Sequence, residues 1–237
     1  MTEAAKPKFF SAIRSVFGRL RLNQSGVALV EFAYTLPIFM GVGMYGTETA
    51  HRAVAEMQVS QAALALADNA GRMGQTGNGN IAPTIQESDV IEALTGTRLQ
   101  TQNLDLLQNG RVILSSLEVR TVTSGGVSRQ QQFIRWQRCK GVRAYTSAYV
   151  GGINTSNAAF TGVGENGNVQ AVTNSAVMFV EIQYAYQPLF GDMFSGGVII
   201  NQDAAFTIRD DRNLAGGLNN DMTPSSLAAT CDKFDAT

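Results

Sequence analysis

Histidine, cysteine and cations are all scarce in this chain of 237 residues, and each shortage excludes a class of chemistry. His51 is the only histidine, so any Ser-His-Asp or Cys-His catalytic arrangement would have to use it. It follows a long apolar run by five residues, where we expect a solvated side chain rather than a catalytic one. Two cysteines and one histidine are too few for a four-ligand structural zinc site. We therefore predict no enzyme activity, no metal, no cofactor and no small-molecule substrate.

Positive charge is also limited, with 18 Lys and Arg against 19 Asp and Glu. Nucleic-acid binding needs a basic surface, so we predict no nucleic-acid partner. Residues 162–167 match the pattern G-x-G-x-x-G. That motif binds dinucleotides only between a strand and a helix, whereas the asparagines around it here indicate turns. We predict no nucleotide site.

What the chain does have is one long apolar run near its start. Residues 27–46 contain a single charge, Glu31, and as a helix they would be about 30 Å long, enough to cross a bilayer. Residues 1–26 carry five Lys and Arg against one Glu, so the positive-inside rule keeps them cytoplasmic and places the rest of the chain outside. A charge at the bilayer centre costs about 2.5 kcal/mol or more, and less near the edge. A plain anchor would have little reason to carry Glu31.

Two other interpretations of the amino terminus remain open. One is a secretory signal peptide cut after Ala55, where Ala53-Val54-Ala55 has the small-x-small pattern. Its apolar run would be longer than usual for such a peptide. The other is a signal anchor that is never cleaved.

Residues 26–37 carry a family resemblance. They match the pattern G-x-x-x-V-E-F-A-x-x-L-P, which resembles the amino-terminal segment of TadE/TadF-like pseudopilins of tight-adherence (Flp-type) pili. The resemblance implies that a prepilin peptidase cuts between Gly26 and Val27, leaving an acidic mature chain of 211 residues. It also implies that Glu31, Phe32 and Pro37 serve assembly, with Glu31 pairing with the new amino terminus of a neighbouring subunit. The implied partners are the inner membrane, the prepilin peptidase, other pilins and pseudopilins, and the pilus assembly platform.

Three differences from the family pattern indicate which kind of pilin-like protein to expect. Val27 is aliphatic, where many processed pilins begin with an aromatic residue or methionine. Phe32 replaces the tyrosine of major Flp pilins, and the chain is much longer than they are. The resemblance therefore points to a minor pseudopilin rather than the bulk subunit of the fibre. Its expected location is the bacterial inner membrane as a single-pass protein, or the fibre itself.

The helix is predicted to continue past the membrane. Residues 47–73 have no proline and repeat apolar side chains every three or four positions, an amphipathic pattern. One helix over residues 27–72 would be about 69 Å long. We thus expect a basic leader over 1–26, a transmembrane helix over 27–46, a helical stalk over 47–73 and an extracytoplasmic domain over 74–237.

The rest of the chain predicts an α+β domain of the kind found in pilins. Short helices are expected at 88–94 and 103–107. Strands are expected at 111–123, 127–139, 177–187 and 198–209, with a hairpin turn at 124–126, which together make a roughly four-stranded antiparallel sheet. Residues 151–168 are expected to form a long loop and residues 210–237 a tail along the surface.

Cys139 and Cys231 are the two cysteines. In an oxidising compartment such a pair usually forms a disulfide, which would attach the tail to the sheet. The alternative is two separate buried thiols. For the whole chain, the alternative to a pseudopilin is a periplasmic binding or sensory domain held by an uncleaved signal anchor.

Overall fold

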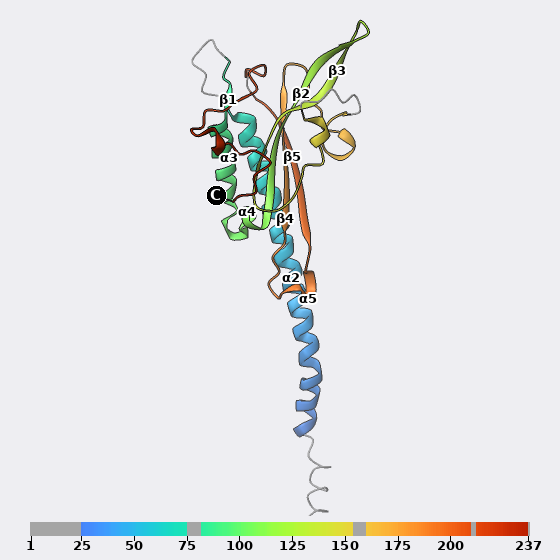
Figure 1. Cartoon of the computed structure of the whole chain (residues 1–237). Coiled ribbons are helices and arrows are strands. Elements are labelled where there is room, and N and C mark those ends of the chain that lie inside the picture. The colour runs from blue at the N-terminus through green and yellow to red at the C-terminus, as the bar shows by residue number, and fades with distance from the viewer. Residues whose placement is uncertain (1–24, 75–81, 154–159, 210–211, 237) are drawn as a thin grey trace, which may run out of the picture. The chain divides into compact units, whose positions relative to one another are not determined.

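A computed structural model describes residues 25–74, 82–153, 160–209 and 212–236 (Figure 1). The expected basic leader, residues 1–26, lies almost entirely outside the described residues. The chain divides between Thr49 and Ala50 into an amino-terminal unit and a compact domain, Ala50–Thr237. The prediction of a long apolar helix followed by a small α+β domain with a four-stranded antiparallel sheet is confirmed.

Helix α2, Ser25–Arg72, is continuous through Pro37. A proline inside a helix has no N–H to donate to the carbonyl four residues earlier, here that of Ala33. Beyond Thr49 the same helix enters the core of the domain. Alanine and larger apolar side chains recur there at steps of three and four residues and are buried: Ala55, Val59, Ala62, Ala63, Leu66, Ala67 and Ala70. Residues 50–72, part of the expected helical stalk, pack in the core of the domain.

The main sheet contains strands β2 (Gly110–Ser124), β3 (Val127–Lys140), β4 (Ala176–Ala185) and β5 (Ile199–Thr207). They are antiparallel in the order β3-β2-β4-β5. Strand β4 is central and almost wholly buried, including its charged residue Glu181. The sequence placed each of these strands within two residues of its observed ends.

A β-bulge changes which side chains of β3 face each side of the sheet. Ser116 pairs with Trp136 and Leu117 with Ile134, so Arg135 is the extra residue. Because a bulge breaks the alternation of side chains, Ile134 and Trp136 lie in different core clusters. Arg135 donates from Nε to Glu118 Oε2 at 3.0 Å.

The sheet separates two apolar clusters. The larger lies between the sheet, α2 and α3 (Glu87–Gln100), and includes Val90, Leu94, Leu114, Met178 and Val180. The smaller lies on the opposite face, under the connection from β3 to β4. Its buried members are Leu117, Ile134, Val163, Ala171, Val177 and Phe179.

The remaining elements are short. They are β1 (Ile85–Gln86), α4 (Leu106–Asn109), α5 (Asp192–Ser195), β6 (Leu218–Asn219) and single 3-10 turns at Gln102–Leu104, Val150–Gly152, Glu165–Gly167 and Ser225–Leu227. Strand β1 pairs in parallel with β6, a pairing the sequence did not predict. Helix α3 is longer than the expected 88–94, since residues 95–100 continue it through Gly96. The connection expected as one loop, 151–168, contains two of these turns.

The carboxy-terminal tail is tied to the domain by buried groups. Arg212 donates to the carbonyl oxygens of Ala70 and Gly71, which are among the last carbonyls of α2 and have no partner within the helix. A cation there also offsets the negative end of the helix dipole. Ala228, Ala229 and Ala236 are buried as well. The tail is thus part of the fold, not only a surface segment.

Candidate functional site

The amino-terminal segment of α2 holds the residues for which the sequence predicts a role in assembly. Gly26 lies in the first turn of the helix and is exposed. A β-carbon placed on Gly26 would meet no atom within 4 Å. Gly26 and Val27 are both exposed, so the peptide bond between them is accessible in the described structure.

Glu31 follows Val27 by one helical turn, or about 6 Å along the axis. Residues four apart lie on the same helix face. A carboxylate near the start of a helix is favoured by the helix dipole, whereas an ammonium group at that start is disfavoured. If the chain began at Val27, its terminal ammonium group would be stabilised by a carboxylate one turn further along the helix.

The side chains around Glu31 are apolar and exposed. Phe32, Tyr34, Ile38 and Phe39 are each more than 60% exposed. A large exposed apolar surface of this kind marks a segment that contacts a membrane or another protein. Within the part of the chain that the structure describes, α2 alone is long and apolar enough to cross a membrane.

Pro37 and Thr35 modify the hydrogen bonding in the middle of this segment. Thr35 Oγ1 donates to the carbonyl of Glu31 at 3.0 Å and lies 3.2 Å from that of Phe32. Backbone bonding of this kind bends helices, as proline does. The two residues together favour a bend in this turn of α2.

His51 has a partner that the sequence did not predict. Its Nδ1 atom lies 2.7 Å from the hydroxyl of Tyr186, and the two rings are 5.6 Å apart. The side chain is half-buried rather than solvated. Because Tyr186 follows β4, this contact joins the domain part of α2 to the sheet. The contact is part of the packing of α2 on the sheet.

A second group of polar side chains lies on the sheet face opposite α2. Glu181 is buried on β4 and accepts hydrogen bonds from Ser147 Oγ at 2.5 Å and from Tyr145 OH at 3.3 Å. It lies directly opposite Asp203 of β5. Burial raises the pKa of both carboxyls, and the Asp203 charge raises that of Glu181 further. Burial and the Glu181 charge raise the pKa of Tyr145 to about 12.

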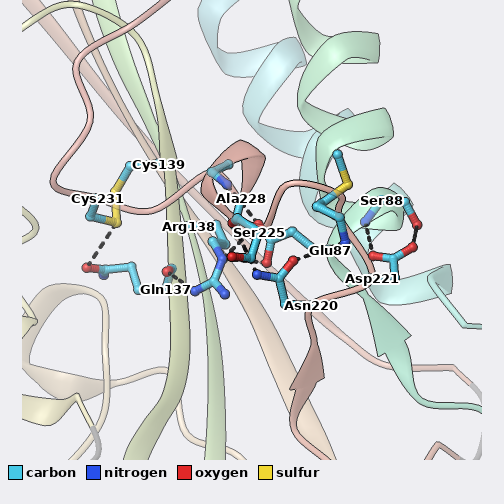
Figure 2. A network of polar contacts seen from close by, with 12 residues as sticks. Glu87, Ser88, Gln137, Arg138, Cys139, Asn220, Asp221, Ser225, Ala228 and Cys231 are labelled. Carbon is cyan, nitrogen blue, oxygen red and sulfur yellow. Dashed lines mark hydrogen bonds and ion pairs between the residues drawn. A yellow bond between two sulfur atoms is a disulfide. The ribbon is translucent and has the colours of Figure 1, made fainter.

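The tail is held by a third group, centred on the buried Glu87 and the half-buried Arg138. Glu87 is fully buried at the start of α3, and both of its carboxylate oxygens lie within 2.9 Å of Arg138 Nε (Figure 2). The N–H of Ala229 donates to the same carboxylate at 2.8 Å. Ser88 donates from its backbone N–H and its hydroxyl to Asp221. Together these contacts join α3, β3 and the tail.

Arg111 and the disulfide hold the end of the tail to the sheet. Cys139 and Cys231 are bridged, as the sequence predicts (Figure 2). Arg111 is buried and donates to the carbonyls of Gly141, Lys233 and Cys231 at 2.7–2.8 Å. Burial lowers its pKa, and the three carbonyls replace the water that it loses. Sequence reasoning missed Glu87, Arg138 and Arg111, because isolated charges in amphipathic segments carry no signal of burial.

Comparison with known protein families, curated proteins and solved structures finds no match to this chain. Among the described residues, no three His, Cys, Asp or Glu side chains gather into a group that could hold a metal ion.

Proposed function

We propose that this chain is a minor pseudopilin of a tight-adherence pilus. In this proposal a prepilin peptidase removes residues 1–26, and the mature chain begins at Val27. The exposed apolar part of α2 then packs with the corresponding helices of other subunits. The domain, Ala50–Thr237, lies on the extracytoplasmic side.

The observation that carries the proposal is the placement of Gly26, Val27 and Glu31. The glycine lies in the first turn of a long exposed apolar helix, and the single acid of that segment lies one turn further on. Cleavage would remove five cations that resist movement out of the membrane. It would also create the ammonium group that offsets the cost of Glu31 in an apolar environment.

The mass of the membrane-extracted protein tests the cleavage directly. A pseudopilin should have the mass of residues 27–237, and its first residue should be Val27. The variant Gly26→Val should keep the leader, because the peptidase requires glycine before the cut. Gly43→Ala is the matched control, since a β-carbon at Gly43 also meets no atom within 4 Å. A wild-type protein that retains residues 1–26 would instead support an uncleaved anchor.

A further inference from the structure

A groove of about 550 Å³ lies beside β3, next to the segment that leads into β4. It is lined by Gln130, Gln131, Gln132, Phe160, Thr161, Gln170, Ala171, Val172 and Thr173. None of these lining residues is charged, and most carry an amide or a hydroxyl group. The groove lies wholly within the domain.

Its walls are held by side-chain hydrogen bonds rather than by a strand ladder. The Gln132 amide donates to the carbonyl of Ala171 and accepts from its N–H, both at 2.9 Å. Thr173 Oγ1 donates to Gln130 Oε1 at 3.0 Å. The side-chain amide of Gln132 thus makes the two hydrogen bonds that a backbone peptide group on a neighbouring strand would make. It holds residues 171–173 beside β3.

These bonds decide what the groove offers a ligand. Because Gln130 Oε1 is occupied by Thr173, Gln130 presents its amide N–H donors. Gln170 Nε2 donates to the carbonyl of Gly167 at 3.4 Å, so Gln170 presents its amide oxygen as an acceptor. The groove therefore offers neutral donors from Gln130 on β3 and a neutral acceptor from Gln170 on the segment that leads into β4.

Phe160 supplies an apolar surface in the same groove. Its half-buried side chain packs against the smaller core cluster. It also lies so close to Gly152 that a β-carbon there would come within 2.6 Å of the ring. These contacts hold the ring in place.

We propose that this groove binds a neutral carbohydrate. A charged ligand would find no opposite charge among the lining residues, and a purely apolar ligand would leave the amides unpaired, which is costly. A sugar has hydroxyls that both donate and accept, and C–H faces that pack on an aromatic ring. The proposal does not depend on cleavage at Gly26.

The test is calorimetric titration of the full chain in lipid nanodiscs, prepared without sugar-based detergent, with cellobiose, maltose and lactose. At least one of these neutral disaccharides should bind saturably at millimolar concentration, and digalacturonic acid should not. Gln170→Ala and Thr173→Val should each weaken binding by about 3- to 10-fold, the loss expected for one hydrogen bond. Gln100→Ala, an exposed glutamine on α3 away from the groove, should leave it unchanged.

Two results would overturn the proposal. One is the absence of saturable binding by all three neutral sugars. The other is binding that the Gln170→Ala/Thr173→Val double variant retains at full strength while its unfolding temperature matches that of the wild type. Phe160→Leu, which keeps an apolar side chain against the core, adds an independent check and should also weaken binding.

Discussion

The buried ion pair between Glu87 and Arg138 allows a quantitative prediction about the tail. Replacing Arg138 by methionine would leave the fully buried Glu87 carboxylate with the N–H of Ala229 as its remaining hydrogen-bond donor among the described residues. Removing one member of a buried ion pair costs about 3–5 kcal/mol, because the other charge stays desolvated. For a domain of this size, 1 kcal/mol lowers the unfolding temperature by about 2–4 °C. Arg138→Met should therefore lower it by about 6–20 °C.

The two partners are not equivalent, which makes the prediction sharper. The Arg138 side chain is 18% exposed and can reach water, whereas Glu87 is completely buried. Glu87→Gln keeps an oxygen for the N–H of Ala229 and leaves a cation that water can solvate. It should cost only about 1–3 kcal/mol. The double variant Arg138→Met/Glu87→Gln should be more stable than Arg138→Met alone.

The assay is thermal unfolding of the full chain in nanodiscs, followed by the fluorescence of Trp136. This is the only tryptophan and it is buried in the larger core cluster. Arg129→Met, on the exposed end of β3, is the control and should change stability by no more than about 0.5 kcal/mol. If Glu87→Gln proved more damaging than Arg138→Met, the buried carboxylate would not be the costly member of the pair.

Three further predictions concern assembly, the disulfide and pH. The Glu31→Ala protein should be cleaved normally but should be incorporated less into fibres, whereas Glu92→Ala, at an exposed acid on α3, should be incorporated normally. A wild-type fibre yield from Glu31→Ala at equal protein level would contradict the pairing role. Cys139→Ser/Cys231→Ser removes a bridge across 92 residues of sequence and should lower stability by about 4–5 kcal/mol in the chain-entropy model, measured by denaturant unfolding. Burial raises the folded-state pKa of Glu181 above its ordinary value of 4.5, so the folded state holds this proton more tightly than the unfolded state does. The stability of the fold should therefore fall as the pH rises from 4.5 through the raised pKa. Glu181→Gln should reduce this decline, and an identical pH profile in the variant would show that Glu181 is not its source.

The strands were predictable because their signals are local. Alternating or continuous apolar residues mark β2 to β5, and residues 124–126 mark the hairpin turn. The long apolar helix was equally clear from residues 27–46. The pair β1–β6 was not predictable, because two residues carry no periodic pattern and their partners are more than a hundred positions away.

The residues of the candidate site also fall into two groups: those that a local sequence pattern marks and those whose partners are distant in sequence. Gly26, Glu31 and Pro37 were singled out by the resemblance that residues 26–37 carry; the structure places them in one helix, and their role in assembly stays a prediction. The roles of His51, Glu87 and Arg111 were not found. Each depends on a partner distant in sequence, such as Tyr186 for His51.

The sequence alone determined where the chain is apolar, where it alternates and where it turns, since these properties depend on neighbouring residues. The tertiary structure alone decided which charges are buried and what compensates them. Glu87 meets Arg138 51 residues later and Ala229 142 residues later. No local pattern records such contacts, because they arise only when the whole chain has folded.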